Sequence, residues 1–195
     1  MAVPDFVLRL RRHVGTDLLW LPAVSGVVLD DDDRLLLTHR VDNGLWGLPG
    51  GILDPGEQPA TGLAREIREE TGVDVEVLAL TSAISGAVIE HANGDLAQYL
   101  VLAFRCRPLG GTAGGAHAAD DENHDVRWFA LDDLPHPLSD GGDERLAHAL
   151  AHRDAGRAGA AWAGPYVRRG APPRALRSTG TAAPRAGPSR PSRRP

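Results

Sequence analysis

The stretch Gly50–Val73, GGILDPGEQPATGLAREIREETGV, decides how the rest of the chain is arranged. Pro59 suits the first turn of a helix, because the N–H that proline lacks would have no helical partner there. Residues 60–71 continue the helical pattern, and Gly72 can adopt the left-handed conformation that closes a helix. The sequence therefore predicts one central helix that follows a glycine-rich loop.

The predicted helix carries acidic side chains on one face. Glu66, Glu69 and Glu70 are three and four positions apart, a spacing that brings side chains together on a helix surface. The other face holds Ala60, Leu63, Ala64, Ile67 and Thr71. Neighbouring carboxylates repel one another, whereas Mg²⁺ or Mn²⁺ prefers hard oxygen ligands and bridges them to phosphates. The acidic face predicts a metal site for a diphosphate; the competing interpretation is an ordinary solvated helix face.

The loop before the helix can add ligands to this cluster. Glu57 lies in that loop, close enough in sequence to join the three helical carboxylates. Gly50 and Gly51 allow the backbone to approach the helix closely, so a main-chain carbonyl can also serve as a ligand.

These positions together resemble a complete Nudix box. Its glycine is Gly51, its first glutamate is Glu57, and its arginine, glutamates and closing Gly-Val follow in residues 65–73. The resemblance extends over roughly residues 18–155 and is to the MutT-like Nudix hydrolases. It agrees with the strand pattern, which combines parallel and hairpin connections around a central helix, and the fold class we expect is α/β. The architecture that we expect is a Nudix-like α/β/α sandwich with a mixed β-sheet.

The resemblance implies an enzyme, a pyrophosphohydrolase that uses Mg²⁺ or Mn²⁺. Its substrate would be a nucleoside diphosphate linked to another moiety. Glu66 and Glu70 would be the principal metal ligands and Glu69 a further one. Gly51 would contribute its carbonyl oxygen, and Glu57 would complete the shell. Arg65 would orient the carboxylates.

The box does not supply a proton acceptor for the attacking water. In the MutT-like branch this role, or a further metal contact, falls to a glutamate about six residues before a tryptophan on a late strand. Glu122, six positions before Trp128, occupies that place in this chain. The alternatives are that the acidic loop, residues 120–125, is solvated surface, or that Glu90, at the end of a strand near a hairpin, is the base.

The sequence does not identify one substrate. ADP-ribose pyrophosphatases often carry a proline where this chain has Val88 and Ile89, and the diadenosine polyphosphate type has a tyrosine where Glu90 stands. We expect a (deoxy)nucleoside triphosphate or an ADP-ribose-like nucleotide. A second class is a Nudix-fold ligand-binding regulator with a basic tail that contacts nucleic acid. A third, isoprenoid diphosphate isomerisation, would require a catalytic cysteine, and Cys106 is the single cysteine.

Two further side chains are candidates for substrate binding. Arg40 ends a predicted strand close to the box and could reach a phosphate, although a surface salt bridge is the competing interpretation. Trp20 precedes the first long strand and could stack on a base, although tryptophan is more often part of the core.

Charge divides the chain into two parts. Residues 1–151 carry a net charge of −14, whereas residues 152–195 carry +9. We predict a Nudix hydrolase domain over residues 1–156 and a disordered Arg/Pro/Ala/Gly-rich tail over 157–195, because the tail has too few apolar residues to offset its ordering entropy. The partners we expect are a small-molecule nucleotide, weakly bound nucleic acid on the tail and a second copy of the chain in a homodimer. No membrane contact is expected.

The remaining composition indicates the compartment and the other elements. One cysteine excludes an intramolecular disulfide, and no apolar run suits a signal peptide, so we expect a soluble cytoplasmic protein. Short helices are expected around residues 6–14 and 143–152. The strands expected outside the box are residues 22–29, 34–39, 73–85, 87–90, 97–107 and 126–130.

Overall fold

The computed structural model of the protein describes residues 3–110 and 115–156, so the predicted tail lies outside the described residues. The helices are α1 (Asp5–Val14), α2 (Pro59–Thr71) and α3 (Gly142–Asp154), with a 3₁₀ turn η1 (Ser139–Gly141). The strands are β1 (Leu19–Val28), β2 (Arg34–Arg40), β3 (Trp46–Gly47), β4 (Gly50–Ile52), β5 (Val75–Ser85), β6 (Ile89–Glu90), β7 (Leu96–Pro108) and β8 (Asn123–Ala130).

The strands of the described residues form two sheets. The larger sheet has the order β4-β1-β7-β5, with β6 also paired to β7, and the smaller has the order β3-β2-β8. Strand β1 runs parallel to β7 over its whole length, whereas the other named pairs are antiparallel. The mixed sheet expected from the sequence is therefore confirmed.

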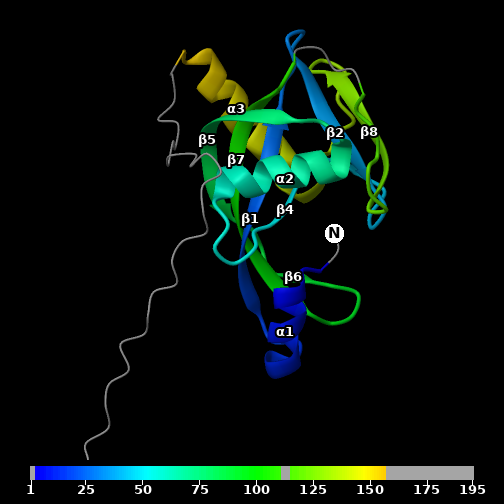
Figure 1. Ribbon diagram of the computed structural model, residues 1–195, viewed down its shortest axis with the longest axis vertical. Coiled ribbons are helices and arrows are strands. Elements are labelled where there is room, and N and C mark those ends of the chain that lie inside the picture. The colour runs from blue at the N-terminus through cyan, green and yellow to red at the C-terminus, as the bar shows by residue number, and fades with distance from the viewer. Residues whose placement is uncertain (1–2, 111–114, 157–195) are drawn as a thin grey trace, which may run out of the picture. The chain divides into compact units, whose positions relative to one another are not determined.

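Helices α2 and α3 cover opposite faces of the larger sheet (Figure 1). Because successive side chains of a strand point to opposite faces, β1 contributes to both layers. Val24 and Val28 pack in the same cluster as Leu63 and Ile67 of α2, whereas Val27 packs with residues of α3. The α/β/α sandwich is confirmed, and β1 is its central strand.

Helix α2 begins and ends where its sequence predicts. Pro59 occupies its first turn, and Gly72 follows it in the left-handed conformation with φ of +71°. Leu63 and Ile67 are completely buried, which holds one side of the helix against the sheet. The acidic side is thereby turned toward the glycine-rich loop.

The predicted strands differ from the observed ones by one to three residues at their ends, and two short strands were not predicted. β1 begins at Leu19 and β8 at Asn123, each three residues earlier than expected. The unpredicted strands β3 and β4 contain two and three residues. They are glycine-rich and too short to show an alternating pattern, and only tertiary pairing with β2 and β1 defines them.

The run of four aspartates at residues 30–33 is not uniformly exposed to solvent. Asp30 is buried and its Oδ1 accepts hydrogen bonds from the backbone N–H groups of Asp32 and Arg34, at 3.0 and 2.8 Å. Its Oδ2 accepts one from Nε of Arg34 at 2.8 Å. Asp30 therefore organises the turn between β1 and β2.

Helix α1 buries only part of its apolar side. Val7 is buried beside Leu21 and Ile52, but Leu10 and Val14 are exposed. Cys106, by contrast, lies in the core next to α2. Within the described ranges, no helix combines the length and the apolar character needed to cross a membrane.

Candidate active site

The glycine-rich loop lies close against both β1 and α2. Gly50 has φ of +151°, and a Cβ there would come within 2.1 Å of the Val24 carbonyl oxygen. At Gly51 an added Cβ would lie 2.4 Å from the carboxyl carbon of Glu66. Gly50 therefore lets β4 lie close against β1, and Gly51 lets it lie directly beneath the Glu66 carboxylate of α2.

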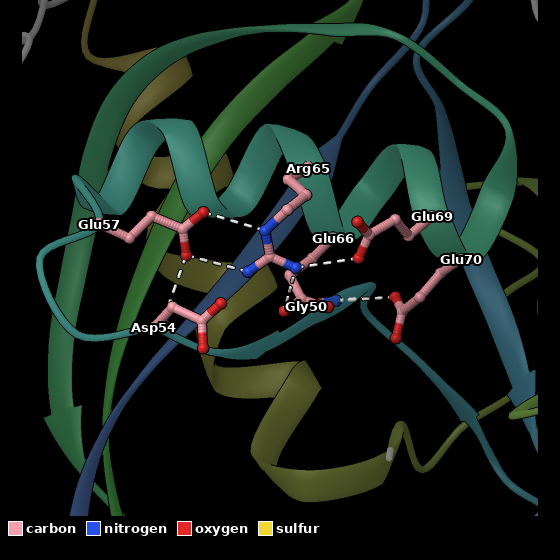
Figure 2. Close-up of polar contacts among 7 residues, drawn as sticks. All are labelled: Gly50, Asp54, Glu57, Arg65, Glu66, Glu69 and Glu70. Carbon is pink, nitrogen blue, oxygen red and sulfur yellow. Dashed lines mark hydrogen bonds and ion pairs between the residues drawn. The ribbon is translucent and has the colours of Figure 1, made fainter. Parts of the chain in front are cut away.

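Glu70 is the buried member of the cluster. Its side chain accepts a hydrogen bond from the Gly50 backbone N–H, 3.0 Å from Oε2 (Figure 2). Burial raises the pKa of Glu70 to about 8, and the nearby charges of Glu66, Asp120 and Glu122 act in the same direction. Negative charge at this position is thus costly unless a cation is close.

Arg65 lies between the carboxylates at the two ends of the cluster (Figure 2). Its Nε and Nη2 donate hydrogen bonds to the two oxygens of Glu57, both at 2.9 Å. Its Nη1 donates to Glu69 at 2.9 Å and pairs with Oε1 of Glu66 at 3.0 Å. One guanidinium therefore contacts three carboxylates, and the orienting role expected from the resemblance stays a prediction.

The pKa values of the neighbouring carboxylates respond differently to the guanidinium of Arg65. The bidentate contact with Arg65 lowers the pKa of Glu57 below its ordinary value. Burial raises the pKa of Glu66 even though Arg65 opposes the shift. Arg65 thus stabilises the charged form of Glu57. Burial opposes the negative charge of Glu66 and Glu70, and neighbouring groups offset this effect only in part.

The acidic loop before β8 brings two further carboxylates next to Glu70 of α2. Carboxylate oxygens of Glu70, Asp120 and Glu122 all lie within 4.8 Å of one another. Glu122 also belongs to the lining of the pocket next to α2, whereas Glu90 lies exposed on β6, paired with Leu96, and does not. The structure therefore brings Glu122, and not Glu90, to the helical carboxylates.

A pocket of about 420 Å³ opens over this cluster. Its lining comprises Pro4, Asp5, Ile52, Asp54, Arg65, Glu66, Glu69, Glu70, Asp120 and Glu122. Asp120 was not singled out from the sequence, although it stands two positions before Glu122 in the same acidic run. Asp5 and Asp54 also line the pocket, and only the tertiary fold brings them there.

The two candidate substrate-binding residues do not line this pocket. Trp20 is 57% exposed on β1, next to Gln98 of β7. Arg40 donates two hydrogen bonds to Asp42, at 3.0 and 2.6 Å, and lies 3.7 Å from Asp140. The structure thus shows the salt bridge that was the competing interpretation of Arg40, while Glu70 is near enough to help raise its pKa.

The donor set fits Mg²⁺ or Mn²⁺. Carboxylate oxygens are hard ligands, and both ions are ordinarily bound by a few of them together with water and substrate phosphates. Glu66 and Glu70 carry charge that burial opposes, and Asp120 and Glu122 add further oxygens beside Glu70. A divalent cation would remove the repulsion within this group.

Comparison with known proteins identifies the family. The NUDIX domain family matches residues 19–150. A MutT-like protein of Streptomyces ambofaciens is 39% identical over 146 residues, which are 75% of this chain and 80% of that protein. The human 8-oxo-dGDP phosphatase NUDT18 is 32% identical over 152 residues, 76% of this chain but only 40% of that protein.

A solved structure indicates the same family as these two relatives. The crystal structure of a MutT NUDIX hydrolase from Burkholderia pseudomallei superimposes with a TM-score of 0.53 and 30% identity, covering 67% of this chain and 98% of that chain. The shared domain includes the glycine-rich loop, α2 and the strands that support them. The chain therefore belongs to the Nudix hydrolase family, and it is an enzyme of the pyrophosphohydrolase class.

Proposed function

We propose that this protein hydrolyses the diphosphate linkage of a small nucleotide in a reaction that depends on Mg²⁺ or Mn²⁺. The observation that carries the proposal is the convergence of Glu66 and Glu70 of α2 with Asp120 and Glu122 of the acidic loop on one open pocket. The substrate class is a (deoxy)nucleoside triphosphate, including oxidised ones, or an ADP-ribose-like nucleotide.

The roles of the residues follow from their positions. Glu66 and Glu70 would hold the cation, together with Glu69 and the carbonyl oxygen of Gly51. Glu57 is held by Arg65, so it supports the cluster through that guanidinium, or as a ligand once the cation competes for it. When bound, the cation would lower the pKa of a water molecule and offset charge on the phosphate oxygens.

Glu122 is the proposed proton acceptor. It lies in the pocket and its carboxylate is grouped with Glu70 and Asp120, whereas the rival Glu90 lies outside the lining. A carboxylate within hydrogen-bond reach of the attacking water can accept its proton as the oxygen bonds to phosphorus. The bond from that phosphorus to the bridging oxygen breaks, and the two products leave as phosphates.

The other two interpretations gain less support from the structure. The isomerase alternative needs a reactive cysteine, but Cys106 is only 1% exposed, lies in the core, and burial raises its thiol pKa. The regulator alternative is not favoured by a complete box with its carboxylates assembled. The basic tail, weak nucleic-acid binding and a homodimer stay predictions, and the tail residues 157–195 lie outside the described residues.

A substrate panel tests the proposal. Purified protein is incubated with 8-oxo-dGTP, the common dNTPs, ADP-ribose, NADH and dinucleoside polyphosphates, each with Mg²⁺, with Mn²⁺ and with EDTA. We expect hydrolysis of at least one nucleotide with either cation and none in EDTA. Product analysis separates release of pyrophosphate from release of phosphate. Tight binding of a nucleotide without turnover would contradict the proposal and favour the regulator.

A further inference from the structure

The acidic loop is attached to the C-terminal end of α2 by its backbone. The His117 N–H donates to the Thr71 carbonyl oxygen and the Ala119 N–H donates to the Glu70 carbonyl oxygen, both at 3.1 Å. The last carbonyl groups of a helix have no partner within the helix, so these bonds satisfy two acceptors that would otherwise require water. The helix end and the loop are thus joined at the residue that carries the buried carboxylate.

The imidazole of His117 adds a side-chain contact at the same junction. Its Nδ1 lies 2.6 Å from the Gly115 carbonyl oxygen, so the tautomer with a proton on Nδ1 donates a hydrogen bond there. A Cβ at Gly72 would come within 2.5 Å of the ring carbon Cε1. The ring therefore rests against the residue that closes α2, in space that any other residue at position 72 would occupy.

The contacts continue from this junction to the carboxylates. Oδ1 of Asp120 accepts hydrogen bonds from the Glu122 N–H at 3.1 Å and from Nδ2 of Asn123 at 3.2 Å. The Glu122 carbonyl accepts one from the Val41 N–H at 2.9 Å. The loop is thereby held at one end by α2 and at the other by β8 and the residue after β2.

We propose that His117 is a positioning residue that seats this loop on α2 so that Asp120 and Glu122 meet Glu70 at one cation. The inference rests on the proposed function for the use of that cation. His117 lies outside the pocket lining, and the hydrogen bond of its ring goes to the Gly115 carbonyl oxygen. Its effect on the carboxylates is therefore exerted through the position of the loop. Without the ring, the backbone hydrogen bonds of His117 and Ala119 would have to hold this end of the loop on α2 against the repulsion of three like charges.

Mn²⁺ binding, measured by isothermal titration and by electron paramagnetic resonance, gives a readout that does not require turnover. We expect His117→Ala to weaken Mn²⁺ binding by roughly 10-fold, the scale typical of residues that orient metal ligands. His117→Asn, which keeps a side-chain N–H donor, should recover part of that loss. His148→Ala, which removes an exposed histidine of α3, is the control and should bind Mn²⁺ like the wild type.

A double-mutant cycle separates positioning from a general structural effect. In an Asp120→Asn, Glu122→Gln background the loop has no carboxylates left to position, so His117→Ala should weaken Mn²⁺ binding no further. Thermal unfolding in EDTA checks that each variant is folded. On the substrate found in the panel, His117→Ala should lower kcat more than it raises KM.

The outcomes distinguish this inference from the proposed function. Equal Mn²⁺ affinity of wild type and His117→Ala, or an equal loss in both backgrounds, would overturn the role of His117. A wild type that binds Mn²⁺ but hydrolyses no nucleotide would overturn the proposed function, and the binding arm would still decide the inference.

Discussion

Arg65 binds Glu57 through two parallel hydrogen bonds of 2.9 Å, and this pair links α2 to the loop that leads into it. The third guanidinium nitrogen, Nη1, is at the same time shared by Glu66 and Glu69. A planar fork can serve these partners together, whereas the single ammonium of lysine cannot. The arginine is therefore required for its geometry as well as its charge.

Arg65→Lys should lower kcat by about 10–100-fold, because the carboxylates lose their common orienting partner. Steady-state kinetics on the substrate identified in the panel measure this effect. Arg68→Lys is the matched control, since Arg68 lies on the same helix with an exposed side chain and, among the described residues, pairs with Asp74 at 3.6 Å. Equal activity of the two variants would show that charge alone is sufficient at position 65.

Gly51→Ala should reduce turnover by at least about 10-fold and destabilise the fold by about 1–3 kcal/mol, because the new methyl group overlaps the Glu66 carboxylate. Turnover and thermal unfolding are measured on the same preparation. Gly86→Ala is the control, since an added Cβ there meets nothing closer than 3.9 Å. A Gly51→Ala variant with native kinetics would contradict the close contact between β4 and α2.

The raised pKa of Glu70 makes stability of the metal-free protein depend on pH. The folded-state value is about 8, above the ordinary 4.5, so folding disfavours the charged form. The contribution of Glu70 to the free energy of unfolding is fully present below pH 4.5 and is lost as the pH rises through 8. In EDTA, Glu70→Gln should therefore match the wild type near pH 4.5 and unfold at a higher temperature near pH 9.

Thermal unfolding across this pH range checks the prediction, and the difference should grow by up to about 1.4 kcal/mol per pH unit within the window. Adding Mg²⁺ should stabilise the wild type at pH 9 and leave Glu70→Gln nearly unchanged. If the variant were less stable than the wild type at pH 9 in EDTA, the charged form of Glu70 would not destabilise the fold as its burial indicates.

The choice of proton acceptor separates Glu122 from Glu90. Glu122→Gln should lower kcat by roughly 10²–10⁴-fold with little change in KM, since a general base acts in the transition state. Glu90→Gln should have a much smaller effect, because Glu90 lies on β6 outside the pocket lining. A larger loss for Glu90→Gln than for Glu122→Gln would transfer the role to Glu90.

The parts of the site that the sequence predicts are local in the chain. Pro59 and Gly72 bound α2, and the spacing of Glu66, Glu69 and Glu70 places them on one helix face without any tertiary information. The resemblance added the expectation for a late glutamate, and the structure indeed brings Glu122 to this face.

Other parts depend on tertiary contacts or on turn conformations that the sequence pattern does not show. Asp120 meets Glu70 only because the loop before β8 is bound to the end of α2, a contact across 50 positions in the chain. Asp30 is buried because the turn folds its backbone N–H groups around that side chain, an effect that a count of acidic residues does not reveal. The pairing of Arg40 with Asp42, two positions away, is by contrast a local contact of the kind that the competing interpretation of Arg40 named.

The central claim is that Glu70 supports hydrolysis through a bound cation, and one measurement tests it most directly. The kcat of Glu70→Gln is compared with that of the wild type at saturating Mg²⁺, with Glu144→Gln on the exposed first turn of α3 as the control. We predict a loss of several orders of magnitude for Glu70→Gln, with a folded protein and native activity for the control. Near-native turnover of Glu70→Gln would contradict the assignment of this carboxylate to the metal site.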